Sequence, residues 1–231
     1  MVCPNGVDIT VIVPALDEAA RIGAALAAAR APGVREIIVV DGGSRDDTAR
    51  LARQYADVVL TAPRGRAVQM NAGAAIARGD VLLFLHADTH LPAGFETAVL
   101  TALADPGVIG GRFDVLLVPS TPLLALIGAL MNLRSRLSGI ATGDQAIFVR
   151  RTVFDEMGGF EPIPLMEDIA FTRALKRRGR IARLGVRVET SSRRWLANGP
   201  LRTVLLMWWL RLLYFCGVAP ERLQRYYANA R

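Results

Sequence analysis

Short apolar runs alternate with helix-like stretches in the first half of this 231-residue chain, and this alternation constrains the fold more than any other feature. The apolar runs are residues 9–13, 36–40, 58–60 and 81–85, and the helix-like stretches lie near residues 18–30, 45–55, 66–78 and 93–104. Short β-rich runs that alternate with helices predict βαβ units. We therefore expect an α/β fold, in which a Rossmann-like, mostly parallel sheet is flanked by helices.

The rhythm changes after about residue 105. Strands are expected at residues 108–118, 145–150, 181–184 and 186–189, and helices at residues 121–136 and 166–178. The second of these helices carries two carboxylates in its first turn, which suits the helix dipole. No linker separates independent domains, so we expect two halves of one unit, at about residues 8–105 and 106–195.

Acidic side chains follow two of the apolar runs directly. Asp41 ends the run 36–40, and His86-Ala87-Asp88 follows the run 81–85. Ligands of open α/β sheets bind beyond the carboxyl ends of the strands. A carboxylate placed there can hold a sugar hydroxyl, or a Mg²⁺ or Mn²⁺ ion that binds diphosphate oxygens. A zinc site formed by His86, His90 and Asp88 is the alternative, but it lacks a fourth ligand at a matching spacing.

Two further motifs accompany these acids. Pro14-Ala15-Leu16-Asp17-Glu18 runs from a strand into a polar turn, where Asp17 or Glu18 would cap the next helix. In the stretch 41–48, the residues from Ser44 to Asp47 can cap the helix that follows. Arg64-Gly65-Arg66 opens the stretch that contains Asn71, and an arginine at a helix start can clamp a diphosphate. Neither GxGxxG nor a P-loop is present, so the phosphates are not held by a glycine-rich loop.

Together these motifs resemble the family 2 glycosyltransferases, which are inverting enzymes with the GT-A fold. Residues 143–151, which begin Gly143-Asp144-Gln145, look like the acceptor-side loop of that family. Met166-Glu167-Asp168 with Arg173 looks like its catalytic-base helix. The resemblance spans roughly residues 8–190, and the order and spacing of the motifs are more specific than any one of them.

The resemblance implies a role for each matching residue. Asp168 would be the general base and Glu167 would support it. Asp88 would coordinate the metal, with His86 as a weaker ligand, because histidine stands where the family usually has aspartate. The residues implied to contact the nucleotide sugar are Pro14, Ala15, Asp17, Glu18, Asp41, Arg66, Asn71, His86, Ala87 and Asp88. Those implied on the acceptor side are Gly143, Asp144, Gln145, Arg194 and Trp195, the last two belonging to an Arg193-Arg194-Trp195 element.

The resemblance implies transfer of a sugar from a nucleotide-diphosphate donor, most often a UDP-sugar, to a hydroxyl acceptor, with Mn²⁺ or Mg²⁺. A catalytically silent nucleotide-sugar binding protein is an alternative, which the histidine at position 86 favours. A sugar-phosphate nucleotidylyltransferase is a further alternative. It would need glycine, arginine and lysine in its N-terminal loop, whereas residues 13–21 contain neither glycine nor lysine.

The C-terminal region is basic and contains a long apolar run. The net charge is −3 for residues 1–165 and +10 for residues 166–231, which suggests an anionic membrane face or a phosphate-rich partner rather than nucleic acid. Residues 201–218 are nearly long enough to cross a bilayer, but Arg211 lies in their middle. This run fits an in-plane membrane helix, a core or dimer helix, or a true span.

These observations lead to an expected organisation and location. We expect a glycosyltransferase domain at residues 1–195 and an apolar, basic helical extension at residues 196–231. The extension would contact a membrane surface, a lipid-like acceptor or a second copy of the chain. Cys3 and Cys216 form no disulfide framework, and no secretory signal precedes the first strand. The expected location is therefore the cytoplasm, at the inner face of the membrane.

Overall fold

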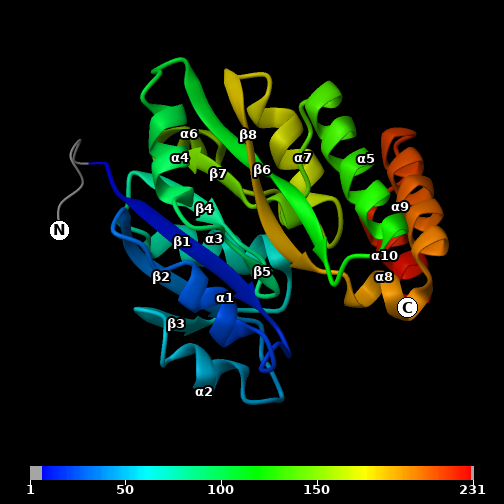
Figure 1. The fold of residues 1–231 in the computed structure, drawn as a ribbon, viewed down its shortest axis with the longest axis horizontal. Coiled ribbons are helices and arrows are strands. Elements are labelled where there is room, and N and C mark those ends of the chain that lie inside the picture. The colour runs from blue at the N-terminus through cyan, green and yellow to red at the C-terminus, as the bar shows by residue number, and fades with distance from the viewer. Residues whose placement is uncertain (1–6, 230–231) are drawn as a thin grey trace.

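The computed structural model describes residues 7–229, and its centre is one mixed sheet (Figure 1). The strand order is β3-β2-β1-β4-β7-β6-β8-β5. The strands are β1 (Ile9–Ala15), β2 (Val34–Asp41), β3 (Val58–Thr61), β4 (Val81–Phe84), β5 (Thr89–His90), β6 (Val108–Val118), β7 (Ile147–Arg150) and β8 (Arg180–Ser191). Strands β1 to β4 are parallel to one another, as are β6 and β8, whereas β7 is antiparallel to β4 and β6, and β5 to β8. The expected mixed, mostly parallel sheet is confirmed.

Helices cover both faces of this sheet. They are α1 (Ile22–Ala28), α2 (Thr48–Ala52), α3 (Arg66–Ile76), α4 (Phe95–Leu103), α5 (Pro122–Ser138), α6 (Arg151–Met157), α7 (Glu167–Leu175), α8 (Arg193–Asn198), α9 (Pro200–Phe215) and α10 (Pro220–Asn229), with a 3₁₀ turn η1 (Gly143–Gln145). One core cluster includes Leu26 of α1 and Val99 of α4, and the other includes Met70 of α3 and Phe171 of α7. Every residue of β1 is buried, which explains why this central strand is apolar without interruption.

The structure corrects two expectations about the polypeptide path. Residues 181–184 and 186–189 belong to one strand, β8, because its ladder with β6 continues through a register shift between Phe113 and Asp114. Helix α6 was not predicted, since it is short and follows β7 without a break, whereas α8 and α10 were covered only by the general expectation of a helical extension at residues 196–231.

Two predicted helix caps also differ. The residue before α1 is Arg21, and no side chain caps that helix, so neither Asp17 nor Glu18 is its cap. The side chain of Asp47 does not cap α2 either, although Asp46 accepts a hydrogen bond from the backbone N–H of Thr48 at the start of that helix.

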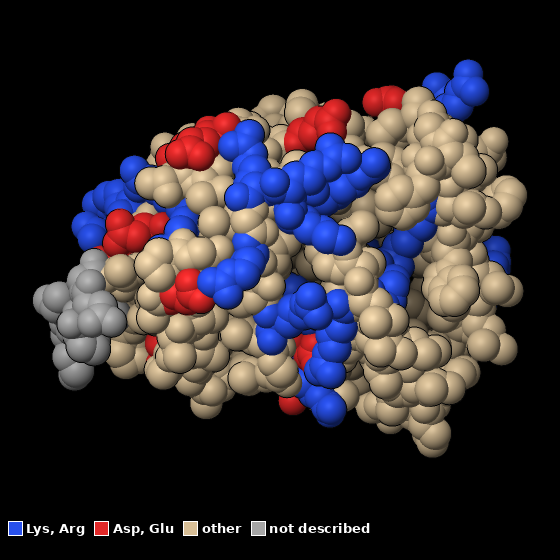
Figure 2. Space-filling view, turned by 90° about the horizontal axis from the view of Figure 1, so that it is seen from above, with Lys and Arg blue, Asp and Glu red and all other residues tan. Residues whose placement is uncertain are grey.

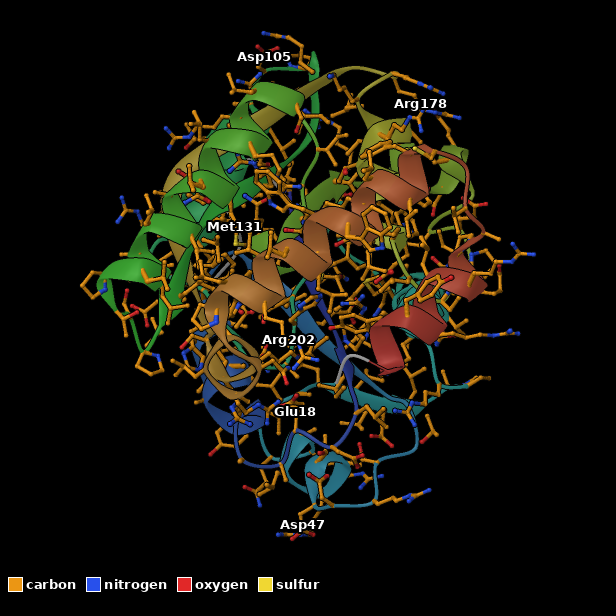
Figure 3. The ribbon with its side chains drawn as sticks, turned by 90° about the vertical axis from the view of Figure 1, so that its right-hand side faces the viewer. Glu18, Asp47, Asp105, Met131, Arg178 and Arg202 are labelled. Atoms are coloured by element: carbon orange, nitrogen blue, oxygen red, sulfur yellow. The ribbon has the colours of Figure 1, made fainter. Side chains whose placement is uncertain are left out.

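The C-terminal helices α8, α9 and α10 pack beside α5 and α7 (Figure 3). Leu210 of α9 is fully buried against Leu165, Met166 and Ile169. Within residues 7–229, no helix has both the length and the apolar character needed to cross a bilayer, so residues 201–218 do not form the span that was one of their interpretations. The thiol of Cys216 is free and exposed, and Cys3 lies outside the described residues.

Basic side chains gather on the face of the molecule that Figure 2 shows. A cavity of about 290 Å³ is lined by Arg112, Lys176, Arg180 and Arg183, together with Ser135, Gly139, Gly179 and Ile181. Arg112 of β6 and Arg183 of β8 are register partners, so two cations occupy neighbouring positions of the sheet. Three basic residues of the C-terminal region, Lys176, Arg180 and Arg183, therefore line the same cavity.

Candidate active site

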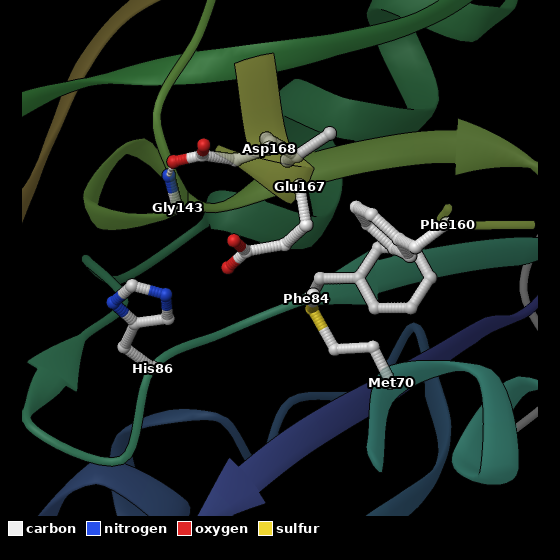
Figure 4. Close-up of a pocket in the computed structure, with 8 residues that line it drawn as sticks. Met70, Phe84, His86, Gly143, Phe160, Glu167 and Asp168 are labelled. Atoms are coloured by element: carbon white, nitrogen blue, oxygen red, sulfur yellow. Dashed lines mark hydrogen bonds between the residues drawn. The ribbon is translucent and has the colours of Figure 1, made fainter. Parts of the chain in front are cut away.

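The sheet brings the predicted acidic positions to one edge. Strand β1 lies between β2 and β4, all three are parallel, and Ala15 is the register partner of Asp41. The segments that carry Asp41 and Asp88 therefore leave the same carboxyl edge, on either side of β1. His86, Gly143, Glu167 and Asp168 line one small pocket there (Figure 4), so the start of α7 in the second half reaches the edge formed by the first half.

The loops after β1 and β2 hold each other through side-chain hydrogen bonds. Asp17 has a positive φ of 54°, its N–H donates to Ser44 Oγ at 3.0 Å, and its carboxylate accepts from the Arg45 N–H at 2.8 Å. The Glu18 N–H donates to Thr48 Oγ1 at 2.8 Å. Asp17 therefore joins two loops of the predicted nucleotide site instead of capping a helix.

Asp41 shapes its own loop. Its carboxylate accepts hydrogen bonds from the backbone N–H groups of Gly43 and Ser44, each at 3.1 Å, and from the Ser44 hydroxyl. Only 5% of Asp41 is exposed. The side chain predicted to reach the nucleoside therefore has most of its hydrogen-bond acceptor capacity engaged within the protein.

Gln69 was not predicted as a site residue, but it binds the ends of the strands β1 and β2 from helix α3. Its buried amide nitrogen donates to the carbonyl oxygens of Ala15 at 3.0 Å and Val40 at 2.7 Å. These are carbonyls at the ends of β1 and β2, where the sheet ladder opens toward the site. A glutamine on the inner face of an otherwise apolar helix is the sequence signal that could have indicated this role.

His86 and Asp144 join the end of β4 to η1. His86 Nδ1 lies 3.2 Å from Asp144 Oδ1. Burial alone would raise the pKa of Asp144, but the hydrogen bond from His86 and the charges of His86, Arg194 and Arg66 outweigh this effect and lower it to about 2. Asp144 is therefore ionised at neutral pH, and His86 Nδ1 is the hydrogen-bond donor.

The His86 ring also determines which residue fits at position 143. A Cβ atom added to Gly143 would lie 2.6 Å from His86 Cε1 and even closer to Nε2. Such a contact is too close to persist, so any side chain at position 143 would require the His86 ring to move. Nδ1 of His86 is engaged with Asp144, which leaves only Nε2 for the weaker predicted role of His86 as a metal ligand, and that role stays a prediction.

Glu167 and Asp168 begin α7 and point in different directions (Figure 4). Asp168 is half-buried, and its carboxylate accepts from the backbone N–H of Gly143 at 2.8 Å and from that of Ile169 at 2.7 Å. Glu167 is only 2% exposed, and its Oε1 lies 2.7 Å from Arg66 Nε. Burial raises the pKa of Glu167, the Arg66 charge opposes the shift, and the Asp168 charge adds to it.

Several predicted site residues have structural partners. Both polar ends of the Asn71 side chain bind the backbone of Phe160, at 2.8 and 2.9 Å, so this amide is not free for a nucleotide. Gln145 is fully buried and reaches the Phe113 carbonyl oxygen, which removes it from the acceptor surface. Ala87 is 5% exposed, Pro14 is buried within β1, and Trp195 packs partly buried against Leu117, Leu124 and Ile127.

The C-terminal basic element contacts the loop after β1. Arg193 Nη2 lies 3.1 Å from Glu18 Oε1, which connects α8 to the loop after β1 across 175 positions of sequence. Arg194 is exposed, and its Nη1 lies 3.4 Å from the Tyr227 hydroxyl. The element at residues 193–195 therefore borders the same edge of the sheet.

Asp88 is the carboxylate best placed to hold a divalent cation. It is half-buried, its carboxylate has no partner in the described part of the chain, and its backbone carbonyl accepts from the Ser191 N–H at 3.2 Å. The structure contains no group of three or more His, Cys, Asp or Glu side chains within residues 7–229 that could enclose a metal. One carboxylate still fits Mg²⁺ or Mn²⁺, because these ions often take their other ligands from water and substrate phosphates.

Comparison with known proteins agrees with this geometry. The model of the family described as Glycosyl transferase family 2 matches residues 10–157, which is more than half of the chain. The chain belongs to glycosyltransferase family 2. Uncharacterized glycosyltransferases of Mycobacterium bovis and Mycobacterium tuberculosis are each 31% identical over 134 residues, which cover 55% of this chain and 60% of the relative. The match thus spans less than two thirds of those relatives.

Two solved structures share the fold. TarS of S. aureus, residues 1–349, superposes with a TM-score of 0.64 at 17% identity, covering 80% of this chain and 60% of TarS. The glucosyl-3-phosphoglycerate synthase of Mycobacterium tuberculosis, solved with Mn²⁺, UDP and glucosyl-3-phosphoglycerate, gives a TM-score of 0.59 at 22% identity, covering 79% and 71%. The chain therefore has a GT-A fold.

Proposed function

We propose that this family 2 glycosyltransferase transfers a sugar, with inversion, from a UDP-sugar to a hydroxyl acceptor and that it requires Mn²⁺ or Mg²⁺. The observation that carries the proposal is the pocket at the carboxyl edge of β4, which His86 and Asp168 line together. The solved synthase with Mn²⁺ and UDP supports the choice of donor and metal. Residues 1–195 would form the catalytic domain and residues 196–231 an extension beside it.

Asp168 would act as the general base in this reaction. Two backbone N–H groups orient its carboxylate, and its partial exposure leaves it accessible to an acceptor. The acceptor oxygen would form a bond to the anomeric carbon while its proton passes to Asp168 and the bond from that carbon to the diphosphate oxygen breaks. Base assistance of this kind contributes about 10²–10⁴-fold to the rate.

The remaining residues would hold the donor and the leaving group. Asp88 would bind the metal, which supplies positive charge for the departing diphosphate. Arg66 would stabilise the same charge from the N-terminus of α3, while its Nε stays paired with Glu167. The linked loops that contain Asp17 and Asp41 would form the nucleoside surface, largely through their backbone groups.

The experiment that tests this function is a comparison of two conservative variants. Asp168→Asn keeps the size of the side chain but removes its basicity, so transfer should fall by at least about 100-fold while UDP binding is retained. Asp155→Asn is the matched control, since Asp155 is an exposed carboxylate on α6, and it should leave turnover unchanged. Unchanged turnover in Asp168→Asn would exclude Asp168 as the base.

A catalytically silent binding protein is the competing function. Hydrolysis of UDP-glucose to UDP in the presence of Mn²⁺, measured without any acceptor, would distinguish the two. We expect slow hydrolysis by the wild type and none by Asp88→Ala. Binding of UDP-glucose with no hydrolysis and no transfer to any acceptor tested would favour the silent protein.

We further propose that α5 and α9 rest on an anionic membrane surface and that the acceptor is reached from there. Apolar side chains on the outer faces of these helices are exposed: Leu126, Leu130, Leu133 and Leu137 on α5, and Leu205, Trp208, Trp209 and Leu212 on α9. Leucine and tryptophan exposed in this way are typical of helices that lie in the membrane interface.

Flotation with vesicles containing phosphatidylglycerol should recover the protein, and Trp208→Ser with Trp209→Ser should reduce that recovery. If the protein instead forms a dimer in vesicle-free solution, and these substitutions make the dimer dissociate, the apolar face would be assigned to contact with a second copy.

A further inference from the structure

Two arginines on helices α5 and α9 have nitrogen atoms without hydrogen-bond partners. The Nε and Nη2 atoms of Arg134 on α5 and the Nε atom of Arg211 on α9 are buried and have no hydrogen-bond partner. Neither guanidinium forms an ion pair within residues 7–229, although both side chains are partly buried. Helices α5 and α9 pack against each other, so the two cations approach from neighbouring elements.

The nearby carboxylates do not compensate the positive charges of the two arginines. Burial, and then the charge of Arg211, lowers the pKa of Arg134 to about 10, and Asp168 and Asp144 oppose this shift. Burial likewise lowers the pKa of Arg211, against the same two carboxylates. Both carboxylates already have partners, because Asp168 accepts from Gly143 and Asp144 from His86.

This arrangement costs the ligand-free protein stability. Buried hydrogen-bond donors without acceptors are rare in folded proteins, and two neighbouring cations repel each other. Arg211 also interrupts the apolar run 201–218, where it turns toward the protein while Trp208 and Leu212 of the same helix are exposed. An occupant with negative charge and several acceptor oxygens would remove both costs.

We propose that Arg134 and Arg211 bind a phosphate monoester group of the acceptor substrate. This inference rests on the proposed function and names the class of acceptor. A phosphate dianion matches two cations and offers oxygens to the forked N–H donors of both guanidinium groups. With its phosphate held there, the acceptor would present a hydroxyl to Asp168, and this fixed orientation would favour attack.

The test is a thermal-shift titration with inorganic phosphate, without nucleotide or metal, on four proteins. Wild type and Arg202→Met should be stabilised equally, because Arg202 is an exposed arginine of the same helix (Figure 3). Arg134→Met and Arg211→Met should each weaken phosphate binding by about tenfold or more. Without phosphate, each of these two variants should melt at or above the wild-type temperature, since a buried unpaired cation is removed. Equal phosphate binding by all four proteins, or no binding by the wild type, would overturn the proposal.

A second titration, with UDP and Mn²⁺, separates this inference from the function on which it rests. UDP should stabilise all four proteins equally if the arginine pair is an acceptor site. Loss of UDP binding together with phosphate binding in Arg134→Met would assign the pair to the donor diphosphate and overturn the acceptor assignment. Phosphate binding that depends on the arginines, with no UDP binding by the wild type, would instead retain the anion site and contradict the proposed function.

Two further probes identify the source of the phosphate. Glycerol 3-phosphate represents a water-soluble acceptor, and phosphatidic acid in phosphatidylcholine vesicles represents a lipid headgroup. Binding of glycerol 3-phosphate that Arg211→Met weakens supports a soluble phosphorylated acceptor. Flotation that requires phosphatidic acid and both arginines supports a lipid phosphate. Binding of either probe that is indifferent to both arginines counts against the proposal.

Discussion

Glu167 Oε1 lies 2.7 Å from Arg66 Nε, and this ion pair joins the first turn of α7 to the first residue of α3. Glu167 is nearly fully buried, and its second carboxylate oxygen has no hydrogen-bond partner in the described structure. The pair therefore links the two halves of the chain directly beneath Asp168. Its position explains how residues about 100 apart in sequence can form one site.

Removal of Arg66 should leave an uncompensated buried carboxylate. Because 38% of the Arg66 side chain is exposed, we expect Arg66→Met to lower the free energy of unfolding by about 1–3 kcal/mol rather than by the larger amount typical of fully buried pairs. Adding Glu167→Gln should restore part of the loss. Urea denaturation of the two single variants and the double variant measures this coupling, and strictly additive losses would show that the pair contributes nothing.

The raised pKa of Glu167 predicts that this residue makes the folded protein less stable as the pH rises. Above the ordinary value of 4.5 the folded protein holds this proton more tightly than the unfolded chain does. Its contribution to stability should therefore fall as the pH rises from 4.5 through the raised pKa. Glu167→Gln should flatten this part of the stability curve, which thermal melts at a series of pH values would measure. An unchanged curve would mean that Glu167 titrates normally.

Asp144 should show the reverse behaviour. Its pKa is lowered from 3.8 to about 2, so its contribution is present above pH 3.8 and is lost as the pH falls toward 2. Asp144→Asn should reduce the acid sensitivity in that window. The control is Asp155→Asn, which changes an exposed carboxylate elsewhere, and equal acid curves for the two variants would contradict the stated role of His86.

Gly143→Ala should disrupt the contact with His86. The added methyl group would collide with the imidazole ring, so we expect a loss of about 1–3 kcal/mol of stability and a large fall in turnover. Gly185→Ala is the matched control, because no atom lies within 4 Å of the corresponding Cβ position. Circular-dichroism melts and transfer assays of both variants would measure the difference. Full activity in Gly143→Ala would show that the loop tolerates a shifted histidine.

Gln69→Met should weaken the edge that the nucleotide would meet. The substitution leaves the carbonyl oxygens of Ala15 and Val40 without this buried donor, which should cost about 1–3 kcal/mol. Gln54→Met alters an exposed glutamine and should change stability by less than about 0.5 kcal/mol. Equal denaturation midpoints for the two variants would contradict the role given to Gln69.

Periodicity predicted the sheet well, because the strands β1, β2 and β4 are almost entirely buried and therefore read as apolar runs. The motifs also singled out His86 and Asp168, which line one pocket, while the roles given to Asp88 and Asp168 stay predictions. Sequence alone could not show that Asp41 and Asn71 would have their polar atoms engaged within the protein. Asn71 binds the backbone of Phe160, which lies 89 positions away, and contacts over such separations leave no local pattern.

The inward turn of Arg211 was hidden for a related reason. A charge in an apolar run argues against a simple span, but only the packing of α9 against α5 and the core around Leu210 shows which side of the helix faces the protein.

The most direct test of the account is the stabilisation of wild type, Asp88→Ala and Asp168→Asn by UDP with Mn²⁺. A ligand at about 100 times its Kd adds roughly 2.7 kcal/mol to stability. We predict this gain for wild type and Asp168→Asn, and its loss in Asp88→Ala or when Mn²⁺ is replaced by a chelator. Equal stabilisation of all three proteins without metal, or stabilisation of none of them, would contradict a metal-bridged nucleotide diphosphate at this edge of the sheet.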